Sequence, residues 1–166
     1  MPNQFANPDN WLSHYEGTAP EIWAQTGGEI SAFVAGMGTS GTLMGVSRRL
    51  HEYDAGIQIV GVEPVPGHAI QGLKNMGESI VPAIYERDRL DRVITVEDRP
   101  AFAMAQRLAL EEGLFVGMSS GAAAYAAVRV AADLSPADTV VVLLPDLGDR
   151  YLSTNLFRSV CADCPP

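Results

Sequence analysis

Lysine is almost missing from this sequence of 166 residues, in which Lys74 is the only one. Chemistry that needs an amine nucleophile therefore has one candidate in this chain or depends on another polypeptide. Cysteine is also scarce, and the two that occur, Cys161 and Cys164, stand together near the C-terminus. A lone C-x-x-C pair can bind a metal or form a local disulfide. Because no second pair of ligands accompanies it, we expect an ordinary chain end and no metal site.

The sequence also lacks long apolar runs, since none approaches the roughly 20 residues that cross a bilayer. Its first residues have neither the basic start nor the apolar core of an export signal, so we expect a cytoplasmic protein. A net charge of -9 argues against nucleic acid or an anionic membrane as a main partner. With 47% hydrophobic residues, the composition is typical of a single soluble domain with one substantial core.

What the sequence does contain is a regular alternation of short apolar runs and stretches of helical periodicity. The runs rich in Val and Ile predict strands at 30–35, 57–62, 92–96 and 139–144. The stretches between them predict helices at 43–53, 101–112 and 122–132. Near-continuous apolar strands that alternate with helices indicate an α/β fold. We expect an open, doubly wound, mostly parallel sheet with helices on both faces.

Two segments depart from this rhythm. Residues 1–28 carry several turn formers and are expected to be an arm that leads into an α/β domain of residues 29–166. Residues 64–84 contain three glycines and three prolines. An interruption of that length inside a compact domain is usually functional or mobile.

A loop of glycines and hydroxyls, residues 36–42, follows the first predicted strand. Glycines let backbone N–H groups approach an anion, and the helix expected next offers its positive N-terminal end. The spacing also fits the G-x-G-x-x-G dinucleotide fingerprint, for which Glu63 would be a somewhat late ribose-binding acid. The hydroxyls of Thr39, Ser40 and Thr42 favour a terminal phosphate monoester instead, because its oxygens need more donors than a pyrophosphate bridge. A plain glycine turn is the remaining alternative.

Two further segments have the character of a site. Ser119 lies in a Gly-Met-Ser-Ser-Gly sequence that enters an alanine-rich helix; it either caps that helix or binds a ligand heteroatom. Asp146 follows the last predicted strand, at the end of the sheet where ligands bind in open α/β folds. Asp149 and Arg150 follow nearby, and the alternative to a ligand site here is an ion pair of these two residues on the surface.

Together these segments resemble those of the cysteine synthase family, the β-substituting enzymes of the fold-type II pyridoxal phosphate group. The resemblance extends over nearly the whole chain, and its wording leans toward the B-type isoform. It is carried by residues 4–8, 20–23, 38–42, 60–64, 117–122 and 148–154.

The resemblance implies a bound pyridoxal 5'-phosphate. Its phosphate would be held by main-chain N–H groups and by the Thr39 and Thr42 hydroxyls, and Ser119 would face its pyridine nitrogen. The cofactor-binding candidates are Gly38, Thr39, Ser40, Gly41, Thr42, Ser119 and Asp146. The implied activity is a β-replacement on O-acetylserine or O-phosphoserine, in which sulfide gives L-cysteine.

The resemblance also implies that a part of the enzyme is not in this sequence. Family members are roughly twice as long, and their N-terminal half supplies the Schiff-base lysine and the loop that binds the substrate carboxylate. Lys74 is not in that lysine's context; it is expected to be a solvated side chain or a contact for an anionic substrate. We therefore expect no catalytic residue on this chain and no cysteine synthesis by it alone. It would form a homo-oligomer, as a dimer, or complement an N-terminal half. A non-catalytic partner module of the same fold and a NAD-binding oxidoreductase domain are the alternatives.

Overall fold

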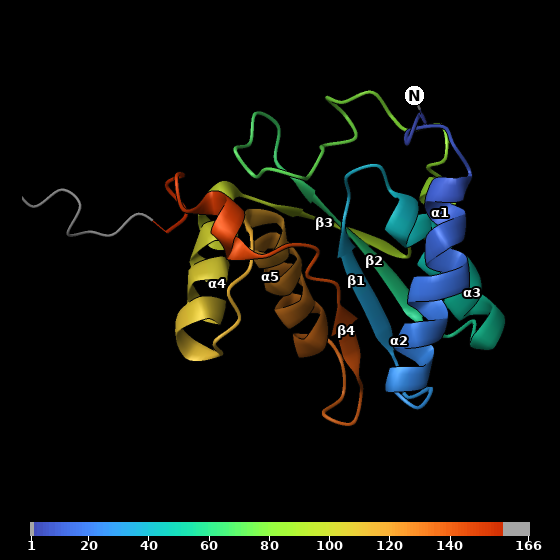
Figure 1. Cartoon of the computed structure of the whole chain (residues 1–166). Coiled ribbons are helices and arrows are strands. Elements are labelled where there is room, and N and C mark those ends of the chain that lie inside the picture. The colour runs from blue at the N-terminus through green and yellow to red at the C-terminus, as the bar shows by residue number, and fades with distance from the viewer. Residues whose placement is uncertain (1, 158–166) are drawn as a thin grey trace, which may run out of the picture.

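The centre of the molecule is a four-stranded sheet in which all neighbouring strands are parallel. The computed structural model describes residues 2–157 and gives the strand order β3-β2-β1-β4 (Figure 1). The strands are β1 (Ala32–Gly36), β2 (Gln58–Pro64), β3 (Arg92–Val96) and β4 (Val140–Val142). In the shared register, Val34 of β1 lies beside Val60 on one side and Val142 on the other. The predicted parallel α/β sheet is confirmed.

Helices cover both faces of this sheet, as the sequence pattern predicts (Figure 1). Residues alternate along β1, so Val34 belongs to a core shared with α4 (Asp98–Glu111) and α5 (Met118–Ala132). Phe33 belongs to a second core shared with α3 (Gly41–Tyr53). Successive side chains of a strand point to opposite faces, and β1 is buried on both. The doubly wound architecture follows directly.

The N-terminal segment, expected to be an arm, is helical over most of its length. It consists of α1 (Asp9–Ser13), a π-helical turn η1 (His14–Thr18) and α2 (Ala19–Gln25). This run packs on α3, where the Arg48 guanidinium lies 4.2 Å above the Trp11 ring. A side chain at Gly45 would overlap the main-chain oxygen of Trp11, so glycine permits the close approach.

Pro64 ends β2, and the rest of the predicted interruption, residues 65–84, contains no regular helix or strand, yet it is held by specific hydrogen bonds. Buried Asn75 donates from Nδ2 to the Pro64 carbonyl and accepts at Oδ1 from the Gly77 amide, both at 2.9 Å. Its own Ile70 and Leu73 are buried in the core that α4 and α5 share with the sheet. This segment therefore packs as a cover over the end of the sheet. Between residues 2 and 157, no helix combines the length and apolar character that a membrane crossing requires.

Candidate functional site

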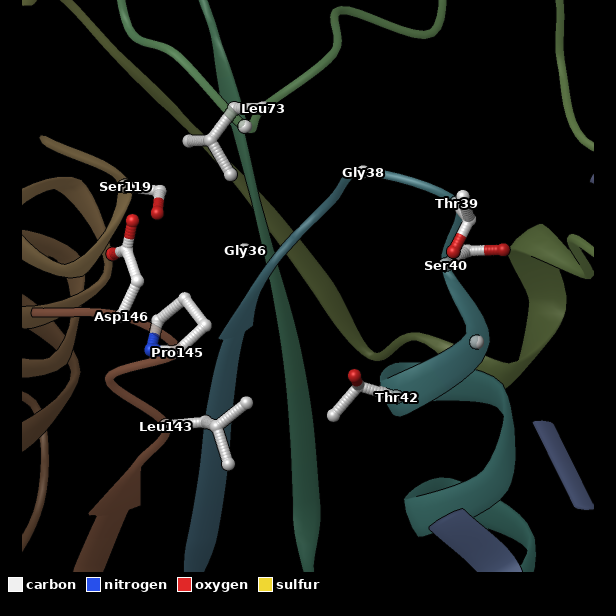
Figure 2. Close-up of a pocket in the computed structure, with 12 residues that line it drawn as sticks. Gly36, Gly38, Thr39, Ser40, Thr42, Leu73, Ser119, Leu143, Pro145 and Asp146 are labelled. Atoms are coloured by element: carbon white, nitrogen blue, oxygen red, sulfur yellow. The ribbon is translucent and has the colours of Figure 1, made fainter. Parts of the chain in front are cut away.

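A cavity of about 280 Å³ lies at the carboxyl ends of β1 and β4 (Figure 2). β2 and β3 follow on one side of β1 and β4 lies on the other, so the strand order reverses at this point. Ligands of open α/β sheets bind at such a switch point. The lining residues are Gly36, Gly38, Thr39, Ser40, Gly41, Thr42, Gly72, Leu73, Ser119, Leu143, Pro145 and Asp146.

One wall of the cavity is the loop that joins β1 to α3. In residues 2–157, no backbone or side-chain acceptor takes a hydrogen bond from the amides of residues 38–42. Ser40 has a φ of 68°, and its hydroxyl is a buried side-chain polar atom without a partner in the described chain. The 13-residue helix α3 begins directly after it at Gly41. Free amides, hydroxyls and a helix N-terminus together form a site for an anion.

The cover segment closes the cavity from above. A Cβ on Gly36 would lie 2.5 Å from Leu73 Cδ2, and one on Gly38 would lie 2.9 Å from the Gly72 carbonyl oxygen. The Lys74 amide donates to the Met37 carbonyl at 2.8 Å, which fastens this segment to the loop. Glycine at these two loop positions therefore keeps room between the strand end and its cover.

The opposite wall comes from the start of α5 and the chain after β4. Figure 2 shows Ser119 and Asp146 there, across Gly36 from Thr39 and Thr42. The Asp146 carboxylate accepts hydrogen bonds from the Tyr151 hydroxyl at 2.5 Å and from the Ser120 hydroxyl at 3.4 Å. Burial is the larger cause, and the hydrogen bond to Asp146 the next, of the rise in the pKa of Tyr151 to about 12. This carboxylate thus links the start of α5 to the chain after β4 and holds the two together in this wall.

The cavity has a clear polarity. Among the described residues that line it, none is Arg, Lys or His, and Asp146 is the one ionisable residue. An anion on the loop side would therefore be held by amide and hydroxyl donors rather than by a side-chain cation. Within residues 2–157, no group of three or more His, Cys, Asp or Glu residues could hold a metal ion.

The structure brings seven of the eight candidate residues to this one cavity. The loop residues 38–42, Ser119 and Asp146 all line it, although they come from three distant parts of the sequence. Lys74 does not line it; its ammonium lies 5.4 Å from the Phe5 ring centroid. Cys161 and Cys164 lie outside the described residues.

Three kinds of contact were not predicted from the sequence. Gly72 and Leu73 form the cover, and nothing in the pattern of residues 64–84 marks them. Leu143 and Pro145 line the cavity because they follow directly after β4. Asn10 and His14 contact the loop from the N-terminal helix. Their spacing of four residues was a usable signal, since it puts both on one helical face.

The fold and this cavity define an open α/β domain with a cavity at its switch point, lined on one side by groups that suit an anion. The family of pyridoxal-phosphate dependent enzymes matches residues 1–146, and the chain belongs to this family.

The curated relatives that the chain matches include proteins named cysteine synthase. The chain is 47% identical over 155 residues to cysteine synthase B of Pseudomonas aeruginosa, a match that covers 93% of this chain and 52% of that protein. It is 46% identical over 159 residues to the cysteine synthase of Aquifex aeolicus, covering 93% and 49%. The chain thus spans about half the length of the curated relatives it matches.

Solved structures agree. O-acetylserine sulfhydrylase isoform 3 of Entamoeba histolytica superposes with a TM-score of 0.85 at 38% identity, covering 95% of this chain and 49% of that one. The O-acetylserine dependent cystathionine beta-synthase of Helicobacter pylori gives a TM-score of 0.88 at 38% identity, covering 95% and 53%. The expected resemblance to cysteine synthases and the fold-type II architecture are confirmed.

Proposed function

We propose that this cavity binds pyridoxal 5'-phosphate, with the phosphate on the loop of residues 38–42. The observation that carries the proposal is the set of loop amides that find no acceptor within residues 2–157, beside the buried Ser40 hydroxyl, which also has no partner there. These groups fit a phosphate monoester, which offers several acceptor oxygens and a negative charge to donors at a helix N-terminus.

The other end of the cofactor would meet Ser119, whose hydroxyl is a neutral partner for the pyridine nitrogen. The Asp146 carboxylate already accepts hydrogen bonds from Tyr151 and Ser120, so it would hold this wall of the cavity in position against the cofactor. When bound, pyridoxal phosphate supplies an electron sink for bonds at the α-carbon of an amino acid. The contribution of this chain is to bind, orient and partly cover that group. In this proposal, residues 29–166 form the cofactor-binding domain and residues 1–28 form the arm that leads into it.

For the whole activity, we propose β-replacement on an activated serine, with sulfide giving L-cysteine. Similarity to proteins named cysteine synthase and O-acetylserine sulfhydrylase supports this reaction. Because the chain spans about half the length of such relatives, it would work as the C-terminal portion of the enzyme. We propose the cytoplasm as its compartment. The Schiff-base lysine would come from an N-terminal half, and Lys74, stacked near Phe5, stays a candidate for binding an anionic substrate.

We also propose self-association or pairing with an N-terminal half. Exposed apolar side chains such as Leu110 on α4 and Val128 on α5, which are 85% and 60% exposed, would be available for such a contact.

A dinucleotide is disfavoured by the position of Glu63. Its carboxylate accepts a hydrogen bond from the Met76 amide at 3.2 Å, and it does not line the cavity. It is therefore not placed to bind a ribose hydroxyl there. A non-catalytic module of the same fold has no use for a complete donor set, so the intact loop favours the cofactor-binding function.

Calorimetry with two vitamers tests the cofactor site. Pyridoxamine 5'-phosphate has no aldehyde, so its binding needs no lysine, and pyridoxamine lacks only the phosphate. We expect the phosphorylated form to bind at least 10-fold more tightly, because one charge-assisted hydrogen bond contributes about 1.5–3 kcal/mol. Thr39→Val removes a loop hydroxyl and should weaken the phosphorylated vitamer about 10-fold. Thr95→Val is the matched control, because Thr95 is exposed on the edge strand β3 and does not line the cavity.

Equal affinity for the two vitamers, or binding of NAD with neither vitamer bound, would overturn the proposed site. The reaction is tested separately by assaying cysteine formation from O-acetylserine and sulfide. We expect none from the chain alone and turnover after adding a separately expressed N-terminal half of a cysteine synthase. Turnover by the chain alone would contradict the expectation that the lysine is supplied from elsewhere.

A further inference from the structure

The N-terminal helical run makes two side-chain contacts with the loop, and both are to threonine hydroxyls. Asn10 Nδ2 donates to Thr39 Oγ1 at 3.0 Å, and His14 Nε2 lies 3.3 Å from Thr42 Oγ1. Asn10 and His14 are four residues apart in one continuous helical run, so they project from the same face. The two contacts therefore reach both ends of the same loop.

The contact of Asn10 has a fixed direction. Its Nδ2 group carries two hydrogens and no acceptor, and it donates to the Gln4 carbonyl at 2.6 Å as well as to Thr39. Thr39 Oγ1 therefore accepts in this bond and keeps its own hydrogen. A hydroxyl has one hydrogen to donate, so Thr39 can give it to another acceptor.

His14 can impose the same direction on Thr42. Burial lowers the pKa of His14, which favours the neutral ring with one N–H donor and one acceptor nitrogen. Its Nδ1 lies 2.9 Å from Thr18 Oγ1, the hydroxyl at the other end of the π-helical turn. If the Thr18 hydroxyl donates to Nδ1, the ring proton lies on Nε2 and is donated to Thr42. The Thr42 hydrogen is then also left for an anion.

Close packing on α3 holds the N-terminal helical run in the position that these contacts need. A side chain on Gly41 would overlap Asn10 Oδ1, and one on Gly45 would overlap the Trp11 main chain. Glycine at these two positions of α3 thus lets the run approach closely enough for Asn10 and His14 to reach the loop. The run and the loop form one packed unit.

We propose that Asn10 and His14 are positioning residues that fix the Thr39 and Thr42 hydroxyls as hydrogen-bond donors toward a phosphate bound on the loop. This inference rests on the proposed cofactor site and extends it to the N-terminal segment. Neither residue lines the cavity, so each acts through a threonine.

The test uses the full chain and compares pyridoxamine 5'-phosphate with pyridoxamine. Asn10→Asp keeps the shape but replaces a donor with an acceptor, which draws the Thr39 hydrogen away from the phosphate. We expect it to weaken the phosphorylated vitamer at least 10-fold and to leave pyridoxamine unchanged. His14→Ala should weaken the phosphorylated vitamer about 5-fold or more. His14→Gln retains an amide donor at the position of Nε2 and should restore affinity to within about 3-fold of the unsubstituted chain.

Ser13→Ala is the matched control, because Ser13 lies on the same helix and its hydroxyl donates only to the Asn10 carbonyl at 2.9 Å. The ³¹P resonance of the bound vitamer provides a second readout: we expect Asn10→Asp and His14→Ala to shift it and Ser13→Ala to leave it in place. Equal weakening of both vitamers, or a His14→Gln variant as weak as His14→Ala, would show a merely structural role and overturn the inference. If the unsubstituted chain itself does not prefer the phosphorylated vitamer, the proposed site is wrong. If it does and all variants equal it, only this inference is wrong.

Discussion

Ser40 combines two unfavourable features in one residue of the loop. Its φ of 68° lies in the left-handed region, which costs an L-residue roughly 1–2 kcal/mol. Its hydroxyl is buried without a partner in the described chain, which costs about 1–3 kcal/mol. Residues held in such conformations cluster at functional sites, where the surrounding structure maintains them. Ser40 is therefore a position where binding and stability should respond in opposite directions.

Two substitutions at this position separate the two costs. Ser40→Ala removes the hydroxyl and keeps the strained backbone, so the free energy of unfolding should rise by about 1 kcal/mol. Ser40→Gly also relieves the strain and should add about 0.5–1 kcal/mol, after allowing for the flexibility of glycine in the unfolded chain. Urea denaturation of the ligand-free chain measures both. Both variants should bind pyridoxamine 5'-phosphate more weakly. Destabilisation by Ser40→Ala would contradict this account.

At the scale of elements, the packing of the N-terminal helical run on α3 depends on a missing side chain. Gly45 lies in the middle of α3, where alanine is ordinarily the better helix former by about 1 kcal/mol. A Cβ at this position would overlap the main chain of Trp11, which cannot move like the end of a flexible side chain.

We therefore expect Gly45→Ala to lower the free energy of unfolding by about 1–3 kcal/mol, the usual cost of overpacking. It should also increase hydrogen exchange in residues 9–25 and weaken binding of the phosphorylated vitamer. Gly17→Ala is the control, since no atom lies within 4 Å of a Cβ there. That variant should be neutral or slightly stabilised. Equal responses of the two variants would show that the close approach is unimportant.

Element boundaries show where local patterns lose their power. Predicted helices begin at residues 43 and 122, but α3 and α5 begin at Gly41 and Met118. The missed first turns consist mostly of glycine, serine and threonine, which carry no apolar period. In α3 and α5 these turns contribute Gly41, Thr42 and Ser119 to the cavity lining, where local rules of helix composition are expected to fail.

At the scale of the whole molecule, Asp146 connects the segment after β4 to α5 and to η3 (Gly148–Tyr151). Tyr151 is buried in the core against α4 and α5, so its hydroxyl depends on this carboxylate for a hydrogen bond. Its pKa, raised to about 12, links this contact to the stability of the chain.

The pH dependence follows from the direction of that shift. Below pH 10, Tyr151 is protonated in both the folded and unfolded states and its contribution is fully present. Between pH 10 and about 12, only the unfolded state releases the proton, so stability falls as the pH rises. Tyr151→Phe should be less stable at pH 8 and should lack about 2 kcal/mol of this alkaline loss. Chemical denaturation of both chains from pH 8 to 12 measures it. Parallel curves would contradict the assignment.

Much of this protein could be predicted from local patterns. Short apolar runs and a period of 3.6 residues are set by neighbours along the chain, so they specified the four strands, the three main helices and the parallel class of the sheet. The loop of residues 38–42 was recognisable for the same reason. Its glycines and hydroxyls are adjacent in the sequence, and an anion site needs them adjacent.

Only the tertiary structure decided what faces this loop. The order β3-β2-β1-β4 brings Ser119 and Asp146 to the same cavity as residues 38–42, and no local pattern encodes that order. The cover at Leu73, the position of Lys74 outside the cavity and the contacts of Asn10 with Thr39 also join distant segments. Such contacts depend on how whole elements pack, because the free energy of burying their faces, rather than any single residue, determines which segments meet.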